Sequence, residues 1–111
     1  MEKLNILWTT TNKDTFSHMI SMYAINGLKK GWWKEINIIV WGASAKLISE
    51  DKEVQDEIQK MLKIGVTIEG CLACSDQFGA TETLKNLGID LKYMGEPLTG
   101  YLKNDEKMLT L

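Results

Sequence analysis

The sequence predicts an α/β protein in which helices cover both faces of a mostly parallel, about five-stranded sheet, a three-layer α/β/α sandwich. Short apolar runs alternate with segments of helical periodicity along all 111 residues. Several of the apolar runs are almost unbroken, which is typical of parallel strands covered on both faces. Since no repeat or linker interrupts the alternation, we expect a single domain over residues 1–111.

The first strand and helix come from residues 3–28. An apolar run, KLNILWT (3–9), predicts a buried strand, and Asn12 or Asp14 can cap the helix that follows. In that helix one core-facing stripe has the spacing of a single face: Phe16, Met19, Ile20, Tyr23, Ala24 and Gly27. A second apolar edge, wider than burial against one sheet needs, consists of Met22, Ile25 and Leu28.

The rest of the chain continues the alternation. Residues 36–41 and 66–70 predict the second and third strands, with helices over about 42–49 and 54–64 between them. Gly65 is expected to end the second of these helices in a left-handed conformation. A helix over about 72–86, ended by Gly88, a strand at 89–94, a helix over about 97–103 and a strand at 107–111 complete the prediction.

Charge and composition exclude several classes of function. The chain has 13 basic and 15 acidic side chains and a formal charge of -2, so no basic surface for nucleic acid is expected. Every basic residue is lysine, which excludes bidentate arginine clamps. The first residues contain no apolar run long enough for a secretory signal or a membrane span, so we expect a cytoplasmic protein without membrane contact, whose cysteines are reduced.

The candidate site follows from the expected topology. Ligands of open α/β sheets bind beyond the carboxyl ends of the strands, and three predicted loops leave those ends: residues 9–14, 41–44 and 70–74. Trp8 and Trp41 are expected to flank this edge. The third loop contains both cysteines of the chain, Cys71 and Cys74.

Cys71 falls at the junction of the third strand and its helix, and Cys74 in the first helical turn. Free amides and the helix dipole at such a position favour a thiolate, whereas the carboxylate of Asp76 opposes it. The residues alone leave three interpretations open: a redox pair, a sulfur carrier with a neighbouring thiol, and two small buried side chains.

No metal or cofactor is expected. A structural zinc site needs four ligands, and besides the two cysteines the chain offers only His18, which is expected on a distant helix. The hydroxyl-rich loop WTTTNKDT (8–15) is similar to loops that hold the phosphate of FMN, but it lacks the glycine that lets backbone approach a phosphate. Helix capping explains its composition more simply.

The chain resembles the DsrE/DsrF-like family of small α/β proteins with flavodoxin-like layering. The resemblance covers nearly the whole chain and rests on element order, on a strand ending in Cys71 with Gly79 eight residues later, and on the closing GIDLKYMGEPLTGYL (88–102). It implies a trimer or hexamer in which Cys71 carries sulfur as a persulfide near a subunit boundary. Relay members tend to have small residues and arginine after the cysteine, and this chain has no arginine there.

Two functions are therefore expected. The first is a sulfur-relay or thiol-redox protein in which Cys71 carries sulfur between donor and acceptor proteins and Cys74 is the resolving thiol. The alternative is a non-catalytic, oligomeric binding module that presents a small-molecule or partner site at the strand ends. For both we expect a homo-oligomer, a trimer or hexamer, since adjacent Trp32 and Trp33 seldom both bury within so small a subunit.

Overall fold

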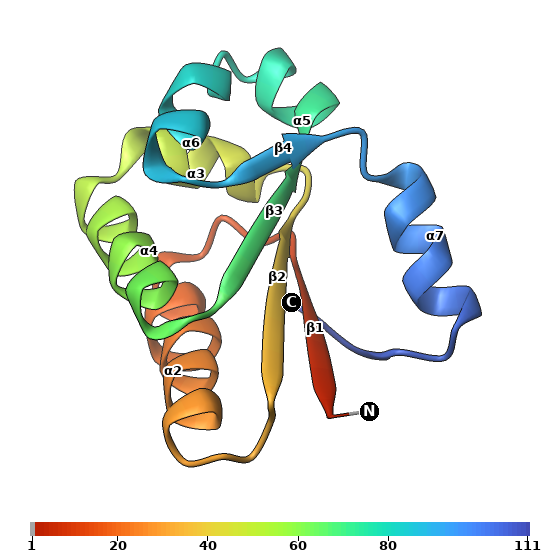
Figure 1. Cartoon of the computed structure of the whole chain (residues 1–111). Coiled ribbons are helices and arrows are strands. Elements are labelled where there is room, and N and C mark those ends of the chain that lie inside the picture. The colour runs from red at the N-terminus through yellow and green to blue at the C-terminus, as the bar shows by residue number, and fades with distance from the viewer. Residues whose placement is uncertain (1) are drawn as a thin grey trace.

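A five-stranded, all-parallel sheet forms the centre of the molecule in the computed structural model, which describes residues 2–111 (Figure 1). The strand order across the sheet is β4-β3-β2-β1-β5. The strands are β1 (Lys3–Trp8), β2 (Glu35–Val40), β3 (Thr67–Cys71), β4 (Asp90–Lys92) and β5 (Lys107–Thr110). The predicted fold class, an α/β/α sandwich around a parallel sheet, is confirmed.

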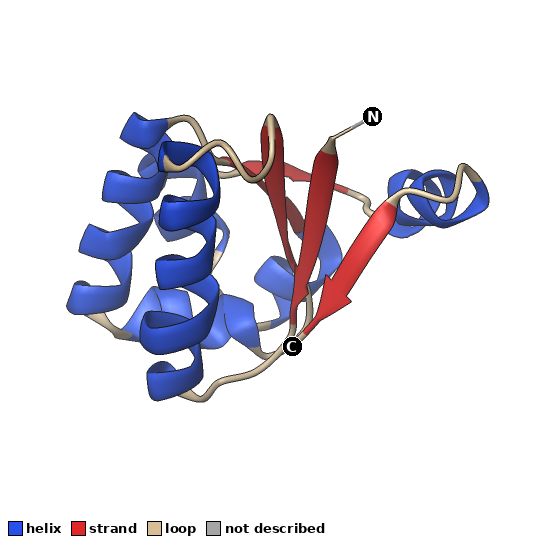
Figure 2. Ribbon diagram, turned by 90° about the horizontal axis from the view of Figure 1, so that it is seen from below, coloured by secondary structure: helices blue, strands red, loops and turns tan. Residues whose placement is uncertain are grey.

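Helices cover the two faces of the sheet unequally. They are α1 (Lys13–Thr15), the π-helix η1 (Phe16–Ser21), α2 (Met22–Lys29), α3 (Ser44–Glu50), α4 (Lys52–Ile64), α5 (Leu72–Gln77), α6 (Thr81–Leu87) and α7 (Gly95–Lys103). The long helices α2 and α4 lie on one side of the sheet, and α7 crosses the other side by itself (Figures 1 and 2). In the part of the chain that the structure describes, no helix is both long and apolar enough to span a membrane.

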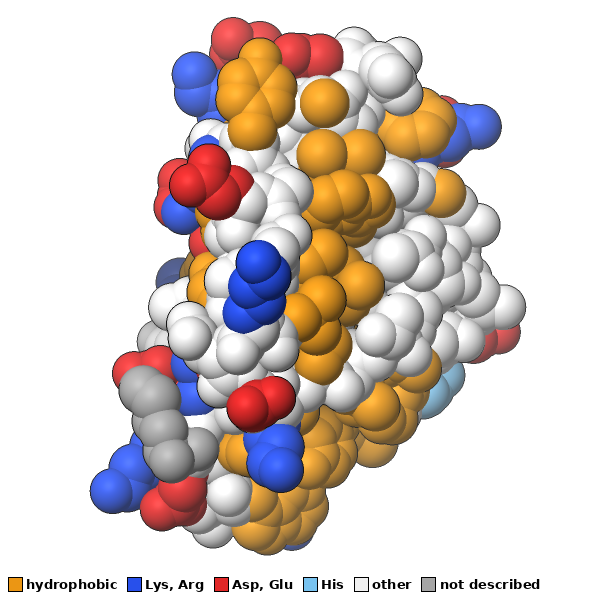
Figure 3. Space-filling view, turned by 90° about the vertical axis from the view of Figure 1, so that its right-hand side faces the viewer, with side chains coloured by type: hydrophobic (Ala, Val, Ile, Leu, Met, Phe, Trp, Pro, Cys, Tyr) orange, Lys and Arg blue, Asp and Glu red, His pale blue; other side chains and the backbone are white. Residues whose placement is uncertain are grey.

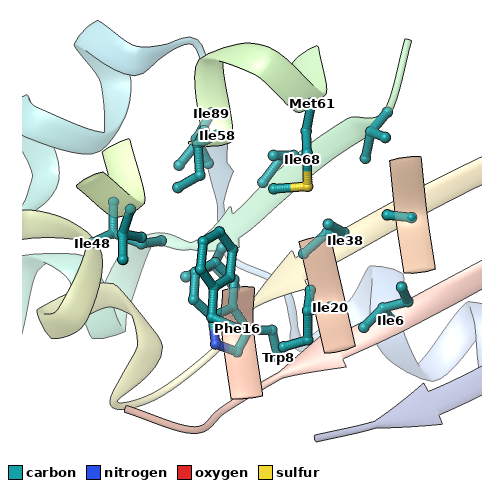
Figure 4. Close-up of a cluster of buried hydrophobic side chains, with 14 of the residues drawn as sticks. Ile6, Trp8, Phe16, Ile20, Ile38, Ile48, Ile58, Met61, Ile68 and Ile89 are labelled. Atoms are coloured by element: carbon teal, nitrogen blue, oxygen red, sulfur yellow. The ribbon is translucent and has the colours of Figure 1, made fainter. Parts of the chain in front are cut away.

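The main core lies between the sheet and the side that carries α2 and α4. Alternate residues of the central strands, such as Ile6 of β1 and Ile38 of β2, point into it because side chains alternate between the faces of a strand. Trp8 is fully buried there and stacks on Phe16, with 4.4 Å between the ring centroids (Figure 4). This cluster contains most of the buried apolar side chains among residues 2–111.

A smaller core lies on the face that α7 covers. Its buried members are Ile39 of β2, Cys71 of β3 and Met94, which precedes α7. Half-buried side chains surround it: Leu7, Trp41, Cys74, Leu98, Tyr101 and Met108. A column of hydrophobic side chains is visible on this side of the molecule (Figure 3). One helix therefore leaves part of this face accessible.

The segment predicted as one helix over 72–86 is two helices. Phe78 and Gly79 separate α5 from α6, and Gly79 has a φ of 65°, which only glycine adopts without strain. The Ala80 amide then donates to the Ser75 carbonyl at 2.8 Å, which closes α5 and redirects the chain. The predicted left-handed end of α4 at Gly65 is confirmed by its φ of 116°.

The second apolar edge predicted for the first helix is mostly packed inside the subunit. Ile25 and Leu28 contact the main core, and Met22 alone of the three is exposed. Trp33 also packs on the core, and its indole N–H donates to the hydroxyl of Tyr23 at 3.0 Å. The neighbouring Trp32 is 51% exposed.

Candidate functional site

The carboxyl ends of the parallel strands bring the three predicted loops to one edge. Ser44, at the start of α3, connects two of these loops, since its hydroxyl donates to the Trp8 carbonyl at 2.6 Å. The amide of Trp41 donates to the same carbonyl at 3.1 Å. Asn12 caps the first helix by accepting from the Thr15 amide, as predicted, so the hydroxyl-rich loop serves helix initiation.

Both cysteines lie at this edge and both are free thiols. Cys71 is the last residue of β3 and the N-cap of α5, with extended backbone, and its side chain makes no capping hydrogen bond. Its side chain points to the face that α7 covers, and the residue is 7% exposed. Cys74, one turn later, is half-buried. The two sulfurs therefore belong to the same small core, and Cys74 is the more accessible.

The protonation of Cys74 depends on its neighbour. Burial raises the pKa of the Cys74 thiol, and hydrogen bonding and charge interaction with Cys71 raise it further. The backbone amides of Gly42 and of Cys74 lower this pKa without outweighing burial. Cys74 therefore retains its proton to higher pH than an ordinary cysteine.

The two tryptophans predicted to flank the edge lie on opposite faces of the sheet. Trp41 packs in the small core with the cysteines. Trp8 does not, because its position in β1 directs it into the main core against Phe16, and its indole N–H donates to the Thr10 carbonyl. Trp8 ends β1 and Trp41 follows β2 at this edge, and of the two only Trp41 packs with the thiols.

A row of polar side chains, not predicted from the sequence, crosses the face that carries Cys71. Asn5, Asn37 and Glu69 are all buried, one in each of the three central strands. The Asn37 amide group donates to Asn5 at 3.2 Å and to Glu69 at 2.8 Å. Asn5 in turn donates to Glu106 at 3.0 Å. The row therefore runs from Glu106, just before β5, to Glu69 in β3.

Glu69 is the most enclosed charge of this row. It accepts hydrogen bonds from Asn37 and from the hydroxyl of Tyr101 on α7, and Lys92 lies 3.1 Å from its other oxygen. Burial raises the pKa of Glu69, but these three donors outweigh burial and hold the pKa below its usual range. The Glu69 carboxylate is thus ionised in the folded protein.

Burial and the hydrogen bond to this carboxylate raise the pKa of Tyr101 to about 12. Hydrogen bonds to Asp90 and Glu69 likewise raise the pKa of Lys92 to about 12.

One sequence feature could have revealed the row. After its polar first residue, each central strand has one polar residue near its middle: Asn5 in KLNILW, Asn37 in EINIIV and Glu69 in TIEGC. A buried polar group needs a hydrogen-bond partner, so polar residues at similar depth in neighbouring strands predict contact with one another. Glu69 also precedes Cys71 by two residues, which places both side chains on one face.

The site contains no grouping typical of a metal centre. Among the described residues, 2–111, no three side chains of His, Cys, Asp and Glu lie close enough together to hold a metal ion. The nucleophilic groups at this edge are the two thiols, and Trp41 and Met94 lie beside them. The row of Asn5, Asn37 and Glu69 lies further along the same face of the sheet.

Comparison with known proteins finds solved structures that are similar to this chain, among them the two described here. No protein-family model matches the chain, and no curated protein matches it either. The conserved protein of unknown function BT1422 from Bacteroides thetaiotaomicron is 56% identical, with a TM-score of 0.97 over 99% of this chain and 95% of that chain. The ychN protein from E. coli is 15% identical, with a TM-score of 0.73 over the whole of both chains, so it shares the fold.

Proposed function

The chain belongs to the same family as the Bacteroides thetaiotaomicron protein of unknown function, and we propose that it is a cytoplasmic sulfur-relay or thiol-redox protein. In this proposal Cys71 carries sulfur as a persulfide and Cys74 is the resolving thiol. The observation that carries the proposal is the pairing of two free thiols at the carboxyl edge of a parallel sheet. The resemblance to the DsrE/DsrF-like family, whose relay members use the cysteine at this position, supports the same assignment.

The environment of the thiols supports different roles for them. Cys74 has a raised pKa and interacts with Cys71, so Cys74 is suited to donate a hydrogen bond to a negative sulfur on Cys71. Cys71 lies recessed among Ile39 and Met94, which limits the access of water to a persulfide. A recessed Cys71 persulfide loses less sulfur to solvent. It also favours donors whose persulfide projects on a slender side chain.

The transfer needs only thiol chemistry. The Cys71 thiolate attacks the outer sulfur of a donor persulfide, a new sulfur–sulfur bond forms, and the donor cysteine leaves as a thiolate. An acceptor thiolate then attacks the outer sulfur and regenerates Cys71. In the redox branch, the Cys74 thiolate attacks the Cys71 sulfur instead and expels sulfide, which leaves a Cys71–Cys74 disulfide that a dithiol reductant must reduce.

The release of sulfide tests this division of roles. Protein loaded by a persulfide donor and freed of that donor is incubated without acceptor. We expect the native sequence to release sulfide and to form the internal disulfide, while Cys74→Ala retains its sulfur until a small thiol is added. Equal sulfide release from the two proteins would contradict a resolving role for Cys74.

A second candidate function is the non-catalytic binding module. The burial of Cys71 and the raised pKa of Cys74 favour it, because both features slow thiol reactions at neutral pH. A module of this kind would use the carboxyl edge to hold a small molecule or a partner protein. Alkylation of both thiols at the rate of buried cysteines, together with no uptake of sulfur from a donor, would select this function over the first.

We also propose that the protein is a homo-oligomer, a trimer or a hexamer. Support comes from three exposed apolar side chains: Trp32, which is 51% exposed, Tyr93 just before α7, and Leu102 of α7. A tryptophan buries roughly 200 Å² when fully covered, so covering the exposed half of Trp32 removes roughly 100 Å² from water and stabilises an assembly by about 2–3 kcal/mol at about 25 cal/mol per Å². Light scattering tests this proposal, and a mass that stays at 12.6 kDa at tens of micromolar protein would contradict it.

A further inference from the structure

Residues 94–103, which we call the cover, close the small core that contains Cys71. The cover consists of Met94, whose side chain is buried, and of helix α7. Met94 and Cys71 belong to one buried cluster, and Leu98 and Tyr101 of α7 pack against that cluster. Since Cys71 is recessed in this cluster, the side chains that pack on it decide the access of other molecules to its sulfur.

The helix of the cover is attached through few contacts. No residue of α7 is buried, and the helix stands apart from the sheet without a second helix beside it (Figures 1 and 2). The hydroxyl of Tyr101 donates to Glu69 in β3, and the ammonium of Lys3 lies 4.6 Å from the centroid of the Tyr101 ring. Segments with few buried apolar contacts open at a lower free energy than the whole protein unfolds.

The sequence of α7, GEPLTGYLK, also forms a helix weakly by itself. Gly95 begins the helix and Gly100 lies inside it, and glycine destabilises a helix interior relative to alanine. The space around Gly100 is open and its φ is not positive, so neither packing nor backbone conformation requires glycine there. The helical state of α7 therefore depends on its contacts with the sheet.

The sheet is arranged so that the cover can leave at a limited cost. When Tyr101 withdraws, Glu69 keeps the amide group of Asn37 at 2.8 Å and the ammonium of Lys92 at 3.1 Å, so the carboxylate is not left without partners. The chain after α7 stays attached, because Glu106 accepts from Asn5 at 3.0 Å and pairs with Lys3 at 3.2 Å. The cover is thus held at its far end independently of Tyr101.

We propose that the cover controls access to Cys71: α7 unwinds and detaches from the sheet while the rest of the protein stays folded, and this opening exposes the Cys71 sulfur to its donor. The hydrogen bond from Tyr101 to Glu69 is the latch that holds the cover closed. The proposal rests on the proposed function of Cys71, but it concerns access to the thiol and not the transfer of sulfur.

The test measures the rate at which iodoacetamide alkylates Cys71 at one pH, in a Cys74→Ser background so that a single thiol reacts. We expect Tyr101→Phe to speed the reaction about tenfold, because it removes a hydrogen bond to a charged acceptor. Tyr93→Phe is the matched control, since Tyr93 is exposed, and should leave the rate unchanged. Gly100→Ala should slow the reaction about two- to fivefold, because alanine stabilises the helix that has to unwind.

Ile58→Val separates opening of the cover from unfolding of the whole protein. Ile58 is fully buried in the main core, on the other side of the sheet, and loss of one methyl group there lowers global stability. We expect this variant to be alkylated at the rate of the Cys74→Ser background. Equal acceleration by Ile58→Val and Tyr101→Phe, equal rates for Tyr101→Phe and Tyr93→Phe, or no slowing by Gly100→Ala would overturn the proposal. Alkylation needs no persulfide, so these rates test the cover whether or not Cys71 accepts sulfur.

Discussion

Asn37 donates a hydrogen bond of 2.8 Å to Glu69 across the pairing of β2 and β3, in the interior of the sheet. This contact joins the polar row to the strand that ends in Cys71. A buried carboxylate destabilises a fold unless donors satisfy it, and here Asn37, Tyr101 and Lys92 do so. The same contacts fix α7 over the small core, so the position of the thiols depends on them.

Tyr101→Phe should lower the free energy of unfolding by about 1–2 kcal/mol, because it removes a hydrogen bond to a charged, buried acceptor. The measurement is urea unfolding at neutral pH. Tyr93→Phe is the matched control, since Tyr93 is 71% exposed, and it should change stability by less than about 0.5 kcal/mol. Equal stabilities for the two variants would show that the hydroxyl of Tyr101 does not support Glu69.

Alkaline pH should lower the free energy of unfolding, because Tyr101 and Lys92 contribute stability only in their protonated forms. Both Tyr101 and Lys92 have a folded-state pKa of about 12, above the ordinary values of 10.0 and 10.5. The unfolded chain therefore releases these protons first, and the stability that they contribute is complete below about pH 10 and falls as the pH approaches 12. Unfolding by urea at several alkaline pH values should show a smaller decrease for Tyr101→Phe than for the native sequence.

Gly79→Ala should destabilise the protein by about 1 kcal/mol, because Gly79 has a φ of 65° and an L-residue is strained there. No atom beyond the two adjacent residues lies within 4 Å of the added methyl group, so backbone strain is the main cost. Gly100→Ala is the matched control, since its site in α7 is equally open and its φ is not positive. It should stabilise the protein by about 0.5–1 kcal/mol. Thermal unfolding of both variants distinguishes strain from a general effect of alanine.

Cys71→Ala should lower the pKa of Cys74, because hydrogen bonding and charge interaction with Cys71 contribute to the raised value. Burial is the largest cause and persists in the variant, so the pKa should remain above that of an unfolded cysteine. The ultraviolet absorbance of the thiolate as a function of pH measures this change. An unchanged or higher pKa would mean that the two thiols do not interact in solution.

Periodicity and capping residues predicted most of the fold. The five strands, the parallel arrangement, the Asn12 cap and the end of α4 at Gly65 all follow from local patterns. The break at Gly79 was missed because the apolar periodicity continues from α5 into α6, while the change in direction depends on the positive φ of one glycine. The π-helical turn of η1 was missed because no sequence pattern distinguishes it from an α-helix.

The site was predicted in part. The strand-to-helix junction predicted that both cysteines lie at the carboxyl edge. Their neighbours depend in addition on the face of the sheet to which each side chain points. The face that carries Cys71 also carries Glu69 and Lys92, and the register that brings Lys92 beside Cys71 depends on tertiary pairing. Trp8 ends β1 at this edge, but its side chain points to the opposite face of the sheet.

Intact mass spectrometry after exposure to a persulfide donor, such as a cysteine desulfurase supplied with cysteine, tests the assignment of Cys71 most directly. We predict that Cys74→Ala gains the mass of one sulfur atom, that a reductant removes this mass, and that Cys71→Ala gains none. Retention of the added sulfur by Cys71→Ala, or no gain by any variant under conditions that load a known carrier, would contradict it.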